Sequence, residues 1–281
     1  MIKAPDVNWL AIAPEMALMI GAFVLLLLAS FIRGRDRGIG TAVGLITLVV
    51  SAGFAINAWT EPATTTMAGA VQIDQLTQVV TVLIAGCGIL TLLVSFGWNR
   101  MRENGAEFVA LLLLVAAGMD LIAASNSFVT LFVALELFSL SLYVLCAFDG
   151  KSKASLESGF KYLVLGTIGS MVLVYGAAFL YGATGSFGFE AINTALSKAG
   201  SGDALVILGT VLVLIGLAFK IGVMPFHILP EMLWLLWLQF LILWQVRQRA
   251  EAVLFITRNL PYWSLWGLWQ DVHWSSPLPS T

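Results

Sequence analysis

Apolar residues run along the chain in long uncharged stretches, which short clusters of charged residues separate. Each stretch is close to the roughly 20 residues that an α-helix needs to cross the hydrocarbon core of a membrane. The pattern predicts spanning helices near residues 8–32, 39–59, 74–98, 106–124, 127–148, 155–181 and 203–222. We therefore expect an all-α fold, a polytopic transmembrane helix bundle of about seven to nine helices.

Basic residues gather in alternate connections between these predicted helices. The first connection carries Arg33, Arg35 and Arg37, the third Arg100 and Arg102, and the fifth Lys151 and Lys153. The second and fourth carry no Lys or Arg, so the positive-inside rule predicts cytoplasmic odd-numbered connections and an N-terminus on the opposite side. In the sixth connection, residues 187–196 predict an amphipathic surface helix, and residues 64–70 read as a plain loop.

Composition supports a membrane protein. Of 281 residues, 59% are hydrophobic and 11% are charged, against roughly 25% charged in soluble domains. The net charge of −2 gives no indication of nucleic-acid binding. Cys87 and Cys146 lie inside apolar stretches without metal-ligand spacing, so we expect buried packing roles and no metal site. The first apolar run is too long for a signal peptide and should remain as a membrane helix.

Ionisable residues interrupt the apolar stretches at four places, namely Asp120, Glu136, the pair Glu157 and Lys161, and Lys220. An Asp, Lys or Arg at the centre of a spanning helix costs roughly 2.5 to 3.5 kcal/mol on insertion scales, so such groups usually face a partner or a water-filled cavity. These residues are therefore the candidate functional groups of the chain.

Glu136 should share one helix face with Ser139, Leu140 and Tyr143, because spacings of three, four and seven residues return to similar angles. This carboxylate can relay protons, or it can only hold its helix against a basic neighbour. Within about 4 Å of a lysine, its attraction would be about 4 kcal/mol at an effective dielectric constant near 20. Separating such a pair would favour release of the lysine proton.

Lys220 stands just before a predicted break in its helix, since Gly222 and Pro225 follow it. Proline cannot donate to the preceding turn, and broken helices survive at membrane depth only where protein or water satisfies the freed carbonyl groups. The alternative is a proline kink beside a lysine that reaches the membrane surface. His227 follows the break, where it can be structural or can pass protons.

The remaining candidates also have structural readings. Glu157 precedes Lys161 by one helical turn, which favours a modest interfacial salt bridge. The small residues Gly166, Gly169 and Ser170 that follow are typical of close helix packing. Asp120 is either an acid near the outer interface or a proton-carrying group, and Ser125, Asn126 and Ser127 after it should cap the next helix.

Three motifs in order carry a family resemblance: ALELFSLSLYVLCAF, ESGFKYLVLGTIGS followed by LYGATGS, and GLAFKIGVMPFH. They resemble the antiporter-like membrane subunits of proton-pumping NADH–quinone oxidoreductase, or respiratory complex I. The N-terminal APEMALMIGAFVLLL is similar to the branch called subunit N. The resemblance runs from about residue 9 to about residue 230.

This resemblance implies proton translocation coupled to electron transfer from NADH to quinone. It implies that Glu136 and Lys220 form a proton-transfer pair, and that Glu157, Lys161 and His227 belong to the proton path. It further implies a multi-pass protein of the bacterial inner membrane, within a hetero-oligomer of complex I subunits. FMN, iron–sulfur clusters, NADH and quinone would bind partner subunits, so this chain would hold no cofactor and catalyse no redox step alone.

The sequence departs from the family pattern after about residue 230, where tryptophans become frequent: Trp234, Trp237, Trp244, Trp263, Trp266, Trp269 and Trp274. We expect three regions, namely helices 1–3 at 1–105, the first antiporter-like repeat at 106–230 and a divergent tail at 231–281. A frameshift is one hypothesis for the tail, and a real membrane anchor rich in interfacial aromatics is the other. A cation/proton antiporter component and an inactive truncated remnant remain alternative functions.

Overall fold

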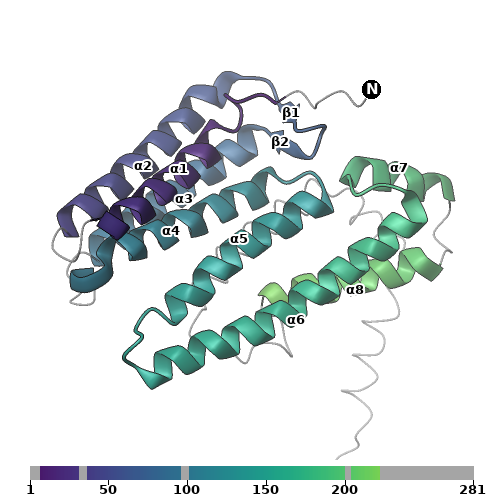
Figure 1. Cartoon of the computed structure of the whole chain (residues 1–281). Coiled ribbons are helices and arrows are strands. Elements are labelled where there is room, and N and C mark those ends of the chain that lie inside the picture. Colours follow the sequence, from purple (N-terminus) through teal and green to yellow (C-terminus); the bar gives the residue numbers. More distant parts are fainter. Residues whose placement is uncertain (1–6, 32–36, 96–100, 200–203, 222–281) are drawn as a thin grey trace, which may run out of the picture.

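The computed structural model describes residues 7–31, 37–95, 101–199 and 204–221 (Figure 1). Its helices are α1 (Ala13–Phe31), α2 (Arg37–Asn57), α3 (Gln75–Ser95), α4 (Met101–Ala124), α5 (Phe128–Cys146), α6 (Lys153–Thr184), α7 (Phe189–Ala199) and α8 (Ala204–Ile221). A short 3₁₀ helix, η1 (Ala58–Thr60), and two strands, β1 (Thr64–Thr66) and β2 (Val71–Ile73), complete the described elements. The predicted break after Lys220, His227 and the tail 231–281 lie outside the described residues.

All seven predicted spans are present as helices long and apolar enough to cross a membrane. The predicted all-α membrane bundle is therefore confirmed for the described part of the chain. Several helix ends differ from the prediction by a few residues, among them the start of α4, at Met101 rather than near residue 106. The first helix begins at Ala13 rather than near residue 8, because residues 9–12 form turns, and α6 continues to Thr184, where Gly185 ends it in the left-handed conformation with φ 72°.

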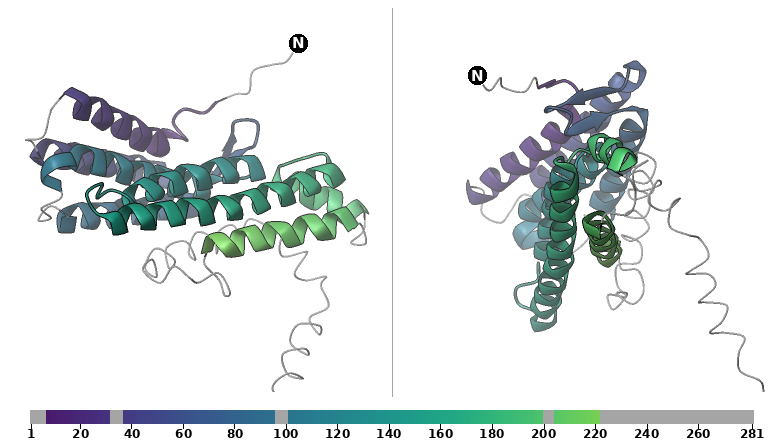
Figure 2. Two further views of the ribbon diagram at one scale, coloured as in Figure 1. Left: turned by 60° about the horizontal axis from the view of Figure 1, so that its bottom comes forward. Right: turned by 90° about the vertical axis from the view of Figure 1, so that its right-hand side faces the viewer.

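The spanning helices form two neighbouring groups. Helices α1 to α4 pack on one another and form the first group, while α6 packs against both α5 and α8 in the second. Contacts between α4 and α5 join the groups, and Figures 1 and 2 show the helices running roughly side by side. A core of buried aliphatic residues continues across this junction, with Leu113 in α4 and Leu131 and Phe138 in α5 each no more than 1% exposed.

The predicted plain loop at residues 64–70 is wrong, because part of it forms a β-hairpin. Strand β1 pairs antiparallel with β2, with Thr64 opposite Ile73. Threonine is β-branched and favours extended backbone, a preference that the run of small polar residues concealed. The turn needs three successive positive φ values, at Met67, Ala68 and Gly69. Asn126 holds its tip, since the Asn126 side-chain amide donates to the Gly69 carbonyl at 2.9 Å.

The predicted surface helix at 187–196 is confirmed as α7, at the same end of the bundle as the hairpin (Figure 1). Phe189, Ile192 and Leu196 recur at helical spacing and are each no more than 5% exposed. Two backbone bonds fix its start, since Phe128 N–H donates to the Phe187 carbonyl at 3.0 Å and Phe189 N–H donates to the Asn126 carbonyl at 3.2 Å.

The predicted burial of the two cysteines is wrong. Cys87 is exposed on α3, and Cys146 at the end of α5 is partly exposed. An apolar stretch in a membrane helix carries residues on its outward face as well as inward, because lipid is as apolar as a protein core. Hydrophobicity alone therefore could not identify which side of the helix each cysteine occupies.

Helix α8 approaches α6 closely because glycines line their contact. A Cβ atom on Gly176 of α6 would lie 2.6 Å from the backbone nitrogen of Val213 in α8. A Cβ atom on Gly216 of α8 would lie 2.7 Å from the backbone nitrogen of Leu173 in α6. Small residues at such positions let helix backbones meet, which is the usual basis of helix association in membranes. This close contact determines where the end of α8 lies.

We predict that Gly176→Ala destabilises the bundle, because its methyl group must push α8 away from α6. Overpacking of this kind costs about 1–3 kcal/mol. The matched control is Gly182→Ala in the same helix, where no atom lies within 4 Å of the added carbon. That control should be neutral or gain up to about 1 kcal/mol from helix propensity. Denaturant unfolding followed by circular dichroism measures both, and equal effects of the two substitutions would contradict the prediction.

Candidate functional site

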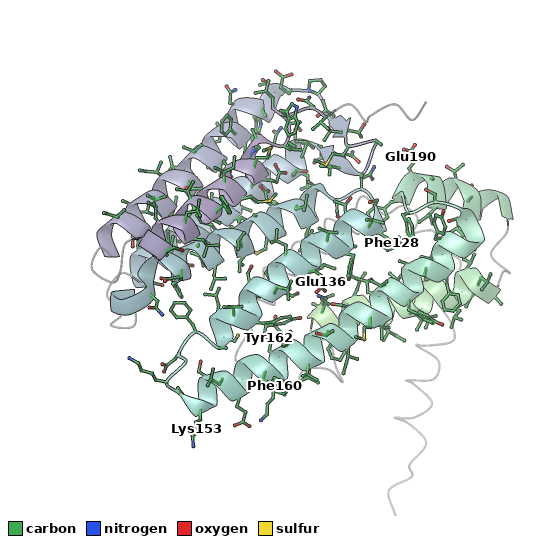
Figure 3. The ribbon with its side chains drawn as sticks, viewed as in Figure 1. Phe128, Glu136, Lys153, Phe160, Tyr162 and Glu190 are labelled. Carbon is green, nitrogen blue, oxygen red and sulfur yellow. The ribbon has the colours of Figure 1, made fainter. Side chains whose placement is uncertain are left out.

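Helix α5 carries Glu136 near its middle, on the side that faces α6 and α8 (Figure 3). The helix starts at a cap, because the Ser127 side chain accepts a hydrogen bond from Thr130 N–H at 3.1 Å. This is the cap that the sequence predicted. Apolar residues occupy the helix on both sides of Glu136, so its carboxylate is the only acidic group along α5.

Lys220 in the last turn of α8 reaches this carboxylate. Its Nζ atom donates to Glu136 Oε1 at 3.1 Å and to Ser139 Oγ at 3.0 Å. The Lys220 side chain is 6% exposed and that of Glu136 is 27% exposed. The structure thus brings together the two charges that lie 84 residues apart in the chain, within the separation that the sequence argument assumed.

Helix α6 contributes a third group, the hydroxyl of Ser170. Its Oγ donates to Glu136 Oε1, and the carbonyl oxygen of Gly166 lies farther away at 3.2 Å. One carboxylate oxygen therefore accepts from both an ammonium and a hydroxyl group. A buried ion pair is tolerated when additional hydrogen bonds satisfy its polar atoms, and this arrangement meets that condition.

Tyr143 extends the polar network along α5. Its hydroxyl is hydrogen-bonded to Ser139, the residue that also accepts from Lys220. The Tyr143 ring meets that of Tyr162 edge to face, with centroids 4.6 Å apart. A Cβ atom at Gly166 would clash with the Tyr143 hydroxyl, so glycine is required there. Leu140, which the sequence placed on the same face, instead points outward and is 52% exposed.

Glu157 and Lys161 form an ion pair with each other, with 2.5 Å between Glu157 Oε1 and Lys161 Nζ. Both side chains are about two-thirds exposed, at 65% and 64%, and neither bonds to Glu136 in the described structure. Helix α6 has 32 residues, which at 1.5 Å per residue is about 48 Å, against a hydrocarbon core of about 30 Å. Its first turns can therefore reach the polar region, as the salt-bridge reading of the sequence supposed.

Asp120 lies wholly inside the first helix group, with no exposed surface. Thr81 of α3 donates to Asp120 Oδ1. Protein atoms therefore surround this carboxyl group near the end of α4. Within the described residues, Asp120 forms no hydrogen bond to the Glu136 and Lys220 network and belongs to a separate polar centre.

Two residues of interest were not identified as candidates from the sequence. Ser170 was assigned to helix packing, yet its hydroxyl bonds Glu136. Its signal was its place four residues after Gly166, because both residues lie on the side of α6 that meets α5. Glu15 in the first turn of α1 is only 3% exposed, although an acid beside a helix start usually reads as a capping or dipole effect.

These features define a class: a polytopic helical membrane protein with an acid–base pair held between its helices. The comparisons agree. Residues 125–262 match the family model described as NADH:quinone oxidoreductase/Mrp antiporter, TM, a match that continues beyond residue 230. The chain belongs to this family of antiporter-like membrane subunits.

Individual relatives support the same assignment. NADH-quinone oxidoreductase subunit N of Myxococcus xanthus is 39% identical over 78% of this chain and 43% of the relative. A solved respiratory complex I from Thermus thermophilus contains a chain 29% identical, with a TM-score of 0.62, covering 76% of this chain and 45% of that one. An Mrp complex from Dietzia is 21% identical, with a TM-score of 0.60 over 76% of this chain and 42% of that one, and shows similarity of fold alone. The chain spans less than half the length of these relatives.

We predict energetic coupling between Ser170 and Glu136, measured as a double-mutant cycle with Ser170→Ala and Glu136→Gln. A hydrogen bond to a charged group contributes about 1.5–3 kcal/mol, so the cycle should return a coupling energy of about 1–3 kcal/mol. Ser141→Ala is the matched control, because its hydroxyl donates to the Leu137 carbonyl of its own helix at 2.9 Å. Its coupling to Glu136 should stay below about 0.5 kcal/mol. A Ser170 coupling as small as that of Ser141 would show that the bond contributes nothing.

Proposed function

We propose that this chain is a membrane subunit of a proton-translocating NADH–quinone oxidoreductase, and that Glu136 and Lys220 transfer protons within it. The observation that carries the proposal is the contact at 3.1 Å between a carboxylate and an ammonium group, both largely enclosed by three membrane helices. Similarity to subunit N over most of this chain supports the choice of complex. Because the chain matches less than half of these relatives, activity of the whole complex is part of the proposal.

The proton step depends on making and breaking the ion pair. At 3.1 Å and an effective dielectric constant near 20, the attraction of the two charges is about 5 kcal/mol. Moving one charge through 100 mV corresponds to about 2.3 kcal/mol. Separation of the pair thus changes the free energy of the lysine proton by more than the membrane field supplies. When the pair opens, Lys220 loses the charge that holds its proton and releases it; when the pair closes, it takes up another.

Hydroxyl groups give the released proton a first acceptor. Ser139 already accepts from Lys220, and Tyr143 bonds Ser139 one turn farther along α5. Both hydroxyls can donate and accept, which a proton relay needs. The direction from Glu136 to Tyr143 leads toward the end of α5 that is followed by Lys151 and Lys153, the end that the charge rule assigns to the cytoplasm.

Electron transfer would take place elsewhere in the complex. In this proposal FMN, iron–sulfur clusters, NADH and quinone bind partner subunits, and this chain contributes only the proton path. It would be an enzyme component without redox activity of its own, in a hetero-oligomer embedded in the bacterial inner membrane. Its N-terminus, hairpin and α7 would lie on the non-cytoplasmic side, which is supported by the absence of Lys and Arg from the connections before α3 and α5.

Purification of the chain also tests two other functions. A cation/proton antiporter component would share the fold, as the Mrp similarity indicates. An inactive remnant would fold but associate with no complex I subunit. Purification of the tagged chain from its own membranes distinguishes all three. Complex I subunits should accompany it, whereas antiporter subunits or no partner at all would contradict the proposal.

Glu136→Gln and Lys220→Met should each lower the number of protons translocated per NADH oxidised in inverted membrane vesicles, because each removes one partner of the proposed acid–base pair. Glu190→Gln on α7, an exposed acid, is the matched control and should leave the ratio unchanged. Each variant must co-purify with the redox subunits, so that loss of assembly is not mistaken for loss of pumping. Normal proton-to-NADH ratios in both assembled variants would rule out the pair as the proton carrier.

Comparison of Lys161 with Lys220 tests which of the two lysines takes part in proton transfer. The family resemblance assigns it a place on the proton path, but it bonds only Glu157 on an exposed face. We predict that Lys161→Met lowers the proton-to-NADH ratio by less than about twofold, since an exposed ion pair contributes little. The same vesicle assay measures it beside Lys220→Met. A loss as large as that of Lys220→Met would instead support a direct role for Lys161.

A further inference from the structure

A second polar centre lies in the first helix group and is separate from the Glu136 and Lys220 network. It consists of Glu15 from α1 and Asp120 from α4, two helices that pack against each other. Asp120 is 0% exposed and Glu15 is 3% exposed. The two carboxyl groups are close enough to interact electrostatically. Within the described residues neither has a basic partner, in contrast to Glu136.

The first indication of a bound proton is the state of the carboxyl oxygens. Asp120 Oδ2 and Glu15 Oε2 are both buried, and neither has a hydrogen-bond partner among the described residues. A buried polar atom without a partner costs free energy, and two ionised carboxylates in a dry interior also repel each other. One proton on the pair removes one negative charge and supplies a donor where the two groups offer only acceptors.

The second indication is independent of the first and comes from Thr81 on α3. Its hydroxyl oxygen lies within hydrogen-bonding distance of Asp120 Oδ1 and, at 2.9 Å, of the Thr77 carbonyl oxygen. Both neighbours are acceptors when Asp120 is ionised, yet a threonine hydroxyl has a single hydrogen to donate. A proton on Asp120 resolves this competition. The acid O–H then donates to Thr81 Oγ1, and Thr81 donates to the Thr77 carbonyl.

We propose that Glu15 and Asp120 form a buried proton-binding site in which the two carboxyl groups hold one proton. The proton resides on Asp120, where the acid O–H donates to Thr81, and Glu15 carries the negative charge of the pair. Nothing in this assignment depends on the function proposed for Glu136 and Lys220.

In the part of the chain that the structure describes, Glu15 is the one charged group seen to interact with Asp120. Helix α1 contributes Glu15 and α3 contributes Thr81. Helix α5 carries Glu136, but that group acts on Lys220 and Ser170. Strand β2 has no charged residue, and the described part of α2 contributes no charged group that interacts with Asp120.

Apolar residues close the site toward the hairpin end of the bundle. Ile12, Val71, Ile73 and Ala124 form a small buried cluster next to Glu15 and the end of α4. This cluster keeps the two acids away from the aqueous surface on that side. The site therefore stores a proton rather than exchanging it freely with solvent.

Infrared spectroscopy of the full chain in lipid nanodiscs tests the proposal, because a protonated carboxyl group has a carbonyl band that an ionised one lacks. The double variant Glu15→Gln/Asp120→Asn should lose the intensity of one protonated group relative to the unsubstituted chain at neutral pH. Acid titration of the same chain calibrates the carbonyl band intensity that corresponds to one protonated carboxyl group. Glu190→Gln is the matched control and should lose none. Loss of two groups, or of none, would overturn the shared-proton assignment.

A substitution that keeps both acids covers the case in which the double variant does not fold. Thr81→Val removes the acceptor for the acid O–H and should shift the frequency of the carbonyl band, whereas Thr81→Ser should leave it in place.

The same two carboxyl groups could instead bind a sodium ion. The thermal unfolding midpoint of the unsubstituted chain is therefore measured in NaCl and, for comparison, in choline chloride. A sodium-dependent rise that Asp120→Asn abolishes would identify a cation site instead of a proton site. An unshifted band in Thr81→Val would also contradict the proposal.

Discussion

The need to compensate the ammonium group of Lys220 is the constraint on which the arrangement of α5, α6 and α8 depends. A charge with 6% of its side chain exposed cannot be left alone, because an unpaired buried ion costs several kcal/mol. Glu136 supplies the opposite charge, while Ser139 and Ser170 satisfy further polar atoms. These four side chains come from three helices, so the ion pair exists only if all three helices pack in register.

Glycines in α6 make this register possible. Gly176 lets α8 approach at backbone distance, and Gly169 leaves room for the ring of Phe219, whose nearest atom would be 2.7 Å from an added Cβ. Phe219 immediately precedes Lys220, so the packing of that ring also directs the lysine toward α5. Gly166 leaves room for the Tyr143 hydroxyl on the opposite neighbour. Small residues of α6 therefore serve helix association on the side of α8 and leave room for the polar network on the side of α5.

Local patterns predicted the elements better than their contacts. Long apolar runs identified all seven spans, and the amphipathic spacing of Phe189, Ile192 and Leu196 identified α7, because both signals are contained in a single segment. The contact between Glu136 and Lys220 joins residues 84 positions apart, which no periodicity specifies. The residue pattern alone therefore named the two charges only as candidates, and the family resemblance was needed to pair them. Ser170 was misassigned because a small polar residue fits a packing role equally well. The hairpin at residues 64–73 was missed because its strands have only three residues each.

The two polar centres, Glu136 with Lys220 and Glu15 with Asp120, differ in the charge of the partner that each carboxyl group meets. In one, a lysine stabilises a carboxylate, and in the other, two buried carboxyl groups interact without a basic partner among the described residues. Their helices meet at Gly118, where an added Cβ would lie 2.7 Å from the backbone nitrogen of Phe138. Gly118 is two residues from Asp120, and Phe138 is two residues from Glu136. Because α4 and α5 meet there at backbone distance and packed interiors compress little, the two polar centres lie on helices that this contact holds in register.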